Sequence, residues 1–166
     1  GAEFEIKGSL QISDSLAINV KQIIDRIDCV GDTMRFVDYK TGDDEIDTPS
    51  VEALFNGNSD KRAKALMQLL LYCHIYRALQ ADNRPIMPVV YKMRSLMTEG
   101  VRLSSVGTNK NKETLIDYHQ VAEEFAECLK RVVEEIFDPE TPFVQAESEH
   151  SCKFCKFKTI CSREEK

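Results

Sequence analysis

The chain lacks long hydrophobic runs, since no apolar stretch approaches the length of about 20 residues that spans a membrane. No signal peptide opens the sequence, and it contains no internal repeat and no low-complexity segment. These absences argue against an integral membrane protein and against a secreted one. We therefore expect a cytoplasmic protein without a membrane partner.

An excess of positive charge is absent as well. The 22 lysines and arginines are outnumbered by 28 aspartates and glutamates, which gives a net charge of −6. A domain with this charge is a poor autonomous binder of nucleic acid, because the phosphate backbone dominates such binding. DNA binding is disfavoured but not excluded, since metal-binding carboxylates add to the negative count and a larger assembly can supply a basic track.

The residues that are present fit one globular domain with a hydrophobic core, because 42% of the 166 residues are apolar and 30% are charged. We expect strands over 4–12, 18–29, 34–40, 86–96 and 101–106. Helices are expected over 61–79, capped by Asp60, and over 118–137. Residues 41–60 are expected to form a polar connection with one helical turn. This order predicts an α/β fold in which helices pack on a mixed sheet. Residues 1–142 form the expected core, and residues 143–166 form an irregular tail that packs on it.

Two acids are predicted to face each other across a hairpin. Gly31 and Asp32 form a two-residue loop, and counting back from it pairs Asp25 with Asp38. Carboxylates directly opposite on one sheet face repel each other, so a fold keeps them most readily with a cation between them. Strand alternation places Lys40 on the same face as Asp38.

Two acids and an amine on one face are typical of metal-assisted phosphodiester hydrolysis. A divalent ion on Asp25 and Asp38 polarises a phosphate and activates water, and oxygen ligands favour magnesium or manganese. The backbone carbonyl of Tyr39 is a further candidate ligand, and Lys40 is suited to orient the attacking water or to offset charge in the transition state. The alternative is a surface of solvated charges, but Ile27 and Phe36 share this face and favour partial burial.

Other polar residues are assigned by their neighbours. Asp28 lies opposite Arg35 and beside Arg26, which indicates an ordinary ion pair. Gln68 and Tyr72 are four residues apart on the long helix, so their side chains meet on one face. Gln68 is suited to bind substrate or metal-bound water, and Tyr72 to contact a phosphate backbone. Alternatively, Gln68 is a helix-edge residue and Tyr72 a tyrosine at the rim of the core.

Three segments in order resemble the motifs of RecB/AddB-type nucleases of the PD-(D/E)XK superfamily: residues 24–28 (IDRID), 37–42 (VDYKTG) and 68–72 (QLLLY). The resemblance implies a restriction-endonuclease-like fold, a mixed central β-sheet flanked by α-helices. It also implies magnesium-dependent, exonuclease-like cleavage of DNA within a helicase-nuclease with a partner subunit, acting in double-strand-break repair and recombination. By this resemblance Asp25 and Asp38 are metal ligands, Lys40 is the catalytic lysine, and Gln68 and Tyr72 are accessory motif residues.

The sequence also departs from that family. Members usually carry an acidic residue or a histidine on a helix before the first core strand, and this residue completes the metal site. No histidine precedes Asp25, and no helix is evident before Phe4. Glu3 and Glu5 would reach the site only by chance of geometry. The chain therefore resembles an N-terminally truncated nuclease domain. The alternative function is a nuclease-like module that binds a partner or a DNA end without cutting.

A cluster of cysteines ends the chain. Cys152, Cys155 and Cys161 have the spacing of a metal knuckle, whereas Cys73 and Cys128 lie in helical patterns as small buried hydrophobes. Zinc held by the three cysteines and His150 is one alternative, and three free thiols are another.

The resemblance points to a third occupant of the cysteine tail. In AddB-like nucleases these three cysteines and one upstream cysteine hold a [4Fe-4S] cluster. No cysteine precedes Cys29, which sits at the hairpin turn and is a poor fourth ligand. We therefore expect the cluster in an intact parent and an empty site in this chain.

Overall fold

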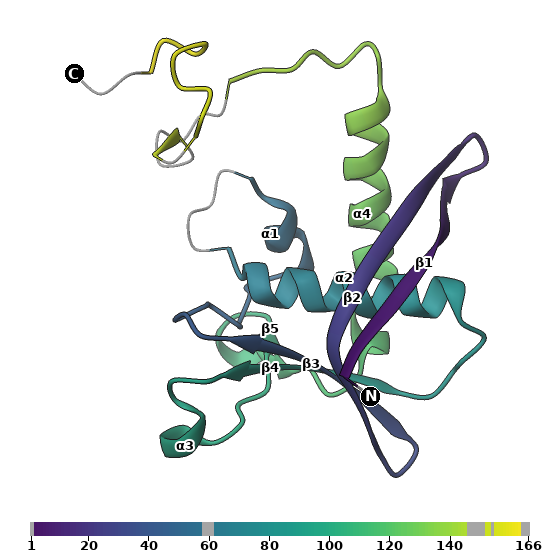
Figure 1. Ribbon diagram of the computed structural model, residues 1–166, viewed down its shortest axis with the longest axis vertical. Coiled ribbons are helices and arrows are strands. Elements are labelled where there is room, and N and C mark those ends of the chain that lie inside the picture. Colours follow the sequence, from purple (N-terminus) through teal and green to yellow (C-terminus); the bar gives the residue numbers. More distant parts are fainter. Residues whose placement is uncertain (1, 58–61, 146–151, 154, 164–166) are drawn as a thin grey trace.

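A four-stranded mixed sheet forms the centre of the computed structural model, which describes residues 2–57, 62–145, 152–153 and 155–163. The strands are β1 (Ala2–Ser13), β2 (Leu16–Val30), β3 (Thr33–Lys40) and β4 (Ile86–Lys92), in the order β1-β2-β3-β4 (Figure 1). The pairs β1–β2 and β2–β3 are antiparallel, and β4 runs parallel to β3. The predicted α/β fold, a mixed central sheet flanked by helices, is confirmed.

The β2–β3 hairpin has the predicted register. Val30 pairs with Thr33 and Ile27 with Phe36, and the ladder continues to the pair Arg26–Val37, one step before Asp25 and Asp38. Gly31 has a φ of 60°, the positive value that a type II′ turn requires at its first central residue. The glycine thus fixes the loop, and the loop fixes which residues of the two strands are opposite.

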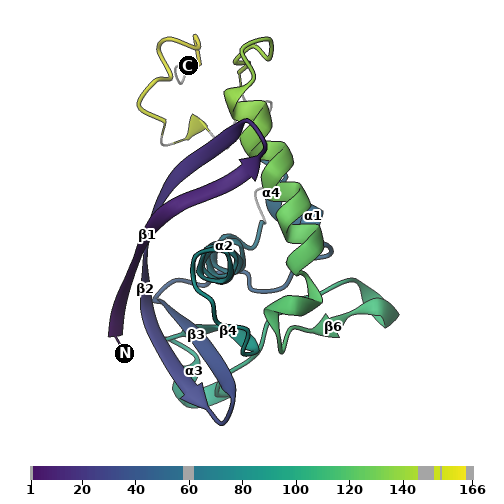
Figure 2. The ribbon, with the colours of Figure 1, turned by 90° about the vertical axis from the view of Figure 1, so that its right-hand side faces the viewer.

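Helices cover one face of the sheet in two layers. Figure 2 shows α2 (Lys64–Leu79) end-on in the hollow of the bent β1–β2 hairpin, where it contacts β1, β2, β3 and β4. Behind it, α4 (Ala122–Phe137) packs against α1 (Val51–Phe55) and the tip of β1. The predicted apolar stripe of α2 is buried throughout, and its members are Ala63, Leu66, Leu70, Cys73 and Tyr76.

Several predicted boundaries were wrong. The long helix begins at Lys64 rather than at residue 61, its N-cap is Ala63 without a side-chain hydrogen bond, and Asp60 lies outside the described residues. The second long helix is preceded by the 3₁₀ turn η2 (Tyr118–Gln120), which Asp117 caps, so α4 starts only at Ala122. The Asp117 carboxylate caps the turn by accepting a hydrogen bond from the His119 N–H. A pattern of apolar residues does not report such a cap.

The strand predicted over 86–96 ends early. A turn follows β4, in which the Ser95 N–H donates to the Lys92 carbonyl, and α3 (Leu96–Glu99) comes next. The strand predicted over 101–106 is reduced to β5 (Ser105–Val106), which pairs with β6 (Glu113–Thr114) across the short turn η1 (Asn109–Asn111). Both deviations come from turns that the alternation of apolar residues does not encode.

The described residues after α4 form no strand and no α-helix (Figure 1). Apolar side chains here are largely exposed, including Phe143, Val144, Phe157 and Ile160. Among the described residues no helix is both long and apolar enough to cross a membrane.

Candidate active site

Asp38 and Lys40 form an ion pair at the end of β3. The Lys40 Nζ lies 2.9 Å from the Asp38 Oδ2. Asp38 is only 2% exposed, whereas 24% of the Lys40 side chain reaches solvent. Strand alternation turns both side chains to the face that α2 covers, because Asp38 and Lys40 are two residues apart. The predicted common face of the two residues is thus present.

Asp25 joins this pair through the backbone of β3. Its Oδ2 accepts a hydrogen bond of 3.0 Å from the Tyr39 N–H, so the carboxylate lies against the strand segment between Asp38 and Lys40. The charge of Asp25 also acts on Asp38, where it helps to raise the pKa of that carboxyl. The structure therefore brings together Asp25, Asp38 and Lys40, as the hairpin register predicts.

Asp25 lies where the burial pattern of β2 changes. From Leu16 to Ile24 every second residue is less exposed than its neighbours, with Gln22 as the polar member, and the next residue that packs on the core is Ile27, three positions on. Asp25 falls within this step. A strand with strict alternation would place Ile24 and Ile27 on opposite faces. At this position the Asp25 carboxylate accepts the hydrogen bond from the Tyr39 N–H of β3.

Gln68 and Tyr72 of α2 extend the ion pair into a chain of hydrogen bonds. The Lys40 Nζ donates to the Gln68 Oε1 at 2.9 Å, and the Gln68 Nε2 donates to the Tyr72 hydroxyl. On the sheet side, the Gln22 Nε2 donates to the Tyr72 carbonyl at 3.1 Å. The predicted contact between Gln68 and Tyr72 is confirmed, and it holds the lysine from the helix side.

Burial and neighbouring charges shift the pKa of both partners. Burial raises the pKa of Asp38, and the neighbouring charges of Asp25 and Asp44 act in the same direction, while Lys40 opposes them. Burial alone would lower the pKa of Lys40, but Asp38 reverses this, so that the pKa of the lysine is raised. The Lys40 ammonium is therefore the counter-charge that permits a buried carboxylate at this position.

Asp44 is a further acid near the site, and the sequence analysis missed it. Burial is the main cause of the raised pKa of Asp38 and Asp38 is the main cause of the raised pKa of Lys40, and the charge of Asp44 adds to both. Gly42 makes room for it, since a Cβ added to Gly42 would lie 3.1 Å from the Asp44 Oδ2. The signal was the run of acids 43–45 directly after β3, which a charge pattern alone assigns to a solvated loop.

The carboxylates are the kind of ligand that a hard divalent ion prefers, but they do not form a complete set of ligands. Asp25 and Asp38 supply oxygen donors, which magnesium and manganese prefer, and magnesium keeps several waters when few carboxylates bind it. Among the residues that the structure describes, no three His, Cys, Asp or Glu side chains gather closely enough to hold a metal ion. The roles of Asp25, Asp38 and the Tyr39 carbonyl as ligands remain predictions.

Asp28 lies apart from this site, as predicted. Its carboxylate binds Arg26 and Arg35, each at 2.7 Å, and these two arginines hold the pKa of Asp28 below its usual range. The hairpin thus carries one acid in an ordinary ion-pair cluster and two acids in the candidate site.

The cysteines divide as expected into buried and tail residues. Cys73 and Cys128 are buried, and Cys29 is exposed near Arg84. In the tail, the Cys152 Sγ accepts from Arg163 at 3.3 Å and the Cys155 Sγ from the Phe157 N–H at 3.4 Å.

The tail cysteines do not form a ligand set in the described part of the chain. Cys152, Cys155 and Cys161 are half-buried, and no group of three metal-binding side chains includes them there. His150 lies outside the described residues. The [4Fe-4S] cluster and zinc remain predictions.

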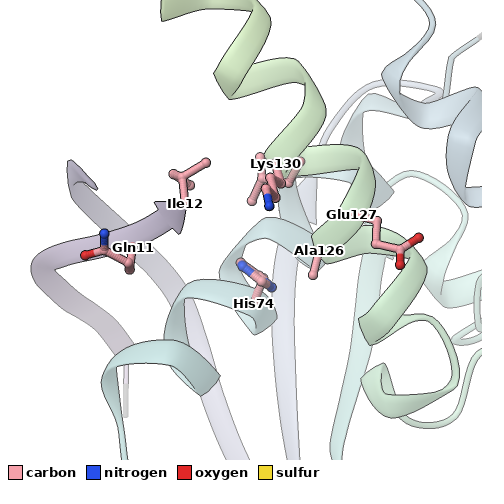
Figure 3. Close-up of a pocket in the computed structure, with 7 residues that line it drawn as sticks. Gln11, Ile12, His74, Ala126, Glu127 and Lys130 are labelled. Carbon is pink, nitrogen blue, oxygen red and sulfur yellow. The ribbon is translucent and has the colours of Figure 1, made fainter. Parts of the chain in front are cut away.

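A pocket of about 210 Å³ lies away from the acids, between the tip of the β1–β2 hairpin, α2 and α4 (Figure 3). It is lined by Gln11, Ile12, His74, Ala126, Glu127, Leu129 and Lys130. The His74 Nδ1 lies 2.9 Å from the Tyr118 hydroxyl, and burial lowers the pKa of His74. This histidine therefore joins α2 to the segment before α4.

Comparison with known proteins identifies a family. A family model described as the PD-(D/E)XK nuclease superfamily matches residues 2–162, which includes the whole described sheet, α2 and α4. No match was found among curated proteins or among solved structures. The four-stranded mixed sheet flanked by helices is consistent with the fold of this family. The chain belongs to the PD-(D/E)XK nuclease superfamily.

Proposed function

We propose that this chain is a magnesium- or manganese-dependent DNA nuclease domain of the RecB/AddB type. Membership of a nuclease superfamily supports phosphodiester hydrolysis. The observation that carries the proposal is the position of Lys40, whose Nζ lies 2.9 Å from both the Asp38 Oδ2 and the Gln68 Oε1. A lysine held between a buried carboxylate and the side-chain amide of a helix residue is positioned to stabilise negative charge that develops beside it.

Each residue has a distinct task in this proposal. Asp25 and Asp38 hold the divalent ion, with the Tyr39 carbonyl as a further ligand. The bound ion supplies Lewis-acid polarisation of the phosphate and a more acidic water. Gln68 holds the Lys40 ammonium from the helix side, and Tyr72 holds Gln68. Lys40 would thereby stay beside a phosphate bound at this face and offset its charge.

Substitution of Asp38 tests the proposal. Asp38→Asn keeps the shape of the side chain but removes its charge, and we expect cleavage of linear DNA with magnesium or manganese to fall by about 10²-fold or more. Asp28→Asn is the matched control, because Asp28 lies on the same hairpin and its carboxylate binds Arg26 and Arg35. Equal activity of Asp38→Asn and the wild type would refute the assignment.

A second candidate function is a nuclease-like module that binds DNA ends or a partner without cutting. The observation in its favour is that no three acidic, histidine or cysteine side chains of the described residues are close enough to bind one ion. Calorimetric titration with manganese separates the two functions. Saturable binding that disappears in Asp25→Asn and Asp38→Asn supports the nuclease, whereas no such binding supports the module.

We further propose, from the family resemblance, that the tail cysteines bind a [4Fe-4S] cluster in a helicase-nuclease that acts in double-strand-break repair and recombination. Zinc is the alternative occupant. Metal analysis of protein purified without oxygen distinguishes iron from zinc. Replacing Cys152, Cys155 and Cys161 with serine is expected to abolish the bound metal, and a metal-free wild type under these conditions would refute both occupants for this chain.

A further inference from the structure

A second lysine lies beside Lys40 on the neighbouring strand. In the parallel register of β3 and β4, Asp38 pairs with Val90 and Lys40 pairs with Lys92. Paired residues of adjacent strands point to the same side of a sheet, and the strands are about 4.8 Å apart. Lys92 is therefore on the face of the sheet that carries Asp38 and Lys40, at the same end of the strands.

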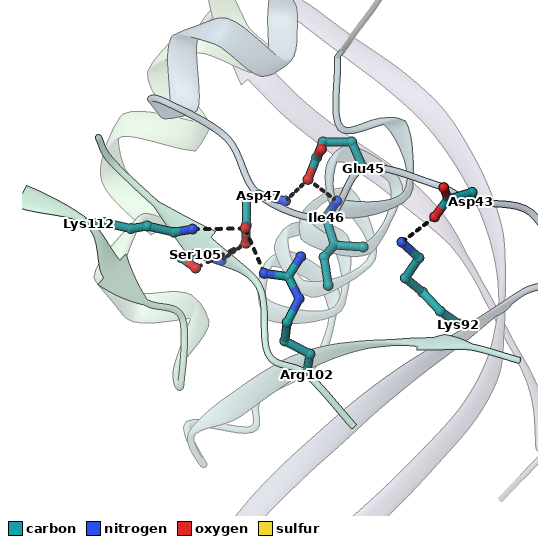
Figure 4. A network of polar contacts seen from close by, with 8 residues as sticks. All are labelled: Asp43, Glu45, Ile46, Asp47, Lys92, Arg102, Ser105 and Lys112. Carbon is teal, nitrogen blue, oxygen red and sulfur yellow. Dashed lines mark hydrogen bonds and ion pairs between the residues drawn. The ribbon is translucent and has the colours of Figure 1, made fainter. Parts of the chain in front are cut away.

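The contacts of Lys92 differ from those of Lys40. Its Nζ lies 2.7 Å from the Asp43 Oδ1, and 25% of the Lys92 side chain is exposed, against 92% of the Asp43 side chain (Figure 4). The pair holds the pKa of Asp43 below its usual range. An ion pair with one partner in water is worth little, typically below about 1 kcal/mol, so another anion can replace Asp43 easily.

Two nearby basic residues, Arg102 and Lys112, are held more firmly. Asp47 accepts from Arg102 at 2.8 Å, from Lys112 at 2.9 Å and from the Ser105 hydroxyl at 3.0 Å, and only 21% of its side chain is exposed (Figure 4). These contacts tie the segment after β3 to β5 and to the loop before β6. Arg102 and Lys112 therefore have a structural partner, whereas the partner of Lys92 is a solvated carboxylate.

We propose that Lys92 is a substrate-positioning residue that binds a DNA phosphate flanking the scissile one, with Asp43 as its exchangeable partner in the DNA-free protein. This inference rests on the proposed nuclease function and adds a subsite to it. Lys40 serves the reacting phosphate, and Lys92, one strand further along the same face, serves its neighbour. The Asp43 carboxylate competes with DNA for Lys92, which also suits a chain with a net charge of −6.

Two opposite substitutions test this subsite. Binding is measured with a short fluorescent DNA oligonucleotide in calcium, and cleavage in magnesium. Lys92→Gln is expected to weaken DNA binding and raise KM by roughly 5–20-fold, to leave kcat within about twofold, and to lower the salt slope by about one. Asp43→Asn is expected to tighten DNA binding, because it removes the competing carboxylate.

Controls separate this inference from the proposed function. Lys112→Gln removes a lysine that binds Asp47, so its DNA affinity should stay near that of the wild type. Lys92→Arg should restore binding, and manganese affinity without DNA should be unchanged in Lys92→Gln. If the wild type cleaves DNA but Lys92→Gln keeps the wild-type KM, or if Asp43→Asn weakens binding, the subsite is refuted while the nuclease stands. A wild type that neither binds nor cuts DNA refutes both.

Discussion

The candidate site depends on the ammonium group of Lys40. This group neutralises the Asp38 carboxylate, which is only 2% exposed, and it also donates to the side-chain amide oxygen of Gln68. A buried charge without a partner costs several kcal/mol, so Lys40 stabilises the fold at this position. Gln68 accepts from the Lys40 ammonium and donates to the Tyr72 hydroxyl, so these two side chains hold the lysine from the helix side.

We therefore expect graded effects along the chain Lys40–Gln68–Tyr72. Gln68→Leu removes the acceptor of the ammonium, and we expect kcat to fall about 10–100-fold with KM little changed, since a hydrogen bond to a charged group is worth about 1.5–3 kcal/mol. Tyr72→Phe removes only the partner of the Gln68 amide, so a decrease of about 2–10-fold is expected. Steady-state kinetics on one DNA substrate measures both. A larger loss in Tyr72→Phe than in Gln68→Leu would contradict this order.

At the scale of elements, the segment after β3 is anchored to the β5–β6 hairpin. Asp47 binds Ser105, Arg102 and Lys112, and the Gly107 N–H donates to the Thr48 carbonyl at 2.9 Å. This segment carries Asp43 and Asp44, which lie beside Lys92 and the Asp38–Lys40 pair. The anchoring thus fixes the acids of the loop relative to the site.

Asp47→Asn is expected to destabilise the protein in a pH-dependent way. Burial opposes the charge of Asp47, but Arg102, Lys112 and Ser105 outweigh burial and lower the pKa of Asp47 to about 2. A carboxyl with a lowered folded pKa stabilises the fold fully above its unfolded pKa of about 3.9, and this contribution is lost as the pH falls toward 2. After allowance for the exposed arginine and lysine, we expect a loss of roughly 1–2 kcal/mol at pH 7.

Urea unfolding of both proteins between pH 7 and pH 3 measures this difference. The gap between wild type and Asp47→Asn should narrow at the acidic end. Asp138→Asn is the control, since Asp138 binds only Thr141 and Glu140 beside it in the sequence and should change stability less. A gap that is constant across this range would contradict the assigned role of the charge.

Gly107→Ala is expected to disrupt the same anchoring. Gly107 has a φ of 108°, and an added Cβ would overlap the Asn111 carbonyl oxygen. Backbone atoms cannot move aside cheaply, so we expect a loss of roughly 2–4 kcal/mol in thermal or urea unfolding. Gly31→Ala is the matched control, because Gly31 has a φ of 60° but no atom within 4 Å of an added Cβ. Its expected loss is about 1–2 kcal/mol, and equal losses would contradict the steric argument.

The sequence predicted those parts of the fold and site that short-range rules determine. The turn at Gly31 sets the hairpin register, alternation places Asp38 with Lys40, and a spacing of four brings Gln68 to Tyr72. Asp44 was missed because its position depends on how the chain turns at Gly42. Lys92 was missed because its neighbour, Lys40, lies on a strand 52 positions earlier, and no local pattern reports a parallel register.

At the scale of the whole molecule, the core and the described part of the tail differ in how much of their apolar side chains is buried. The described buried apolar residues run from Ile6 to Val133, and they come from the sheet, α1, α2, α4 and their connections. By contrast, Phe143 is 98% exposed and Phe157 is 66% exposed. Hydrophobic stabilisation follows the apolar area removed from water, so we expect the described residues from Phe143 onward to contribute little to the free energy of unfolding in the absence of metal.

We expect a chain that ends at residue 142 to fold and to unfold within about 2–4 °C of the full chain, because a change of about 1 kcal/mol shifts the midpoint by that much at this size. A chain that ends at residue 121 is the control. It lacks α4 and with it the buried Phe125 and Leu129, and it should not fold. Circular dichroism and thermal unfolding measure both variants, and a chain of 142 residues that does not fold would show that the tail belongs to the core.

Metal loading extends the same comparison. Binding that favours the folded state raises the unfolding midpoint, and a metal that joins three tail cysteines can stabilise only the chain that contains them. If Cys152, Cys155 and Cys161 hold iron-sulfur or zinc and the loaded tail then packs on the core, loading should raise the midpoint of the full chain and leave the 142-residue chain unchanged. Loading that stabilises both chains equally would place the metal at the carboxylates of β2 and β3 instead. Loading that binds to the tail without shifting the midpoint would mean that residues 143–166 form a unit independent of the nuclease core.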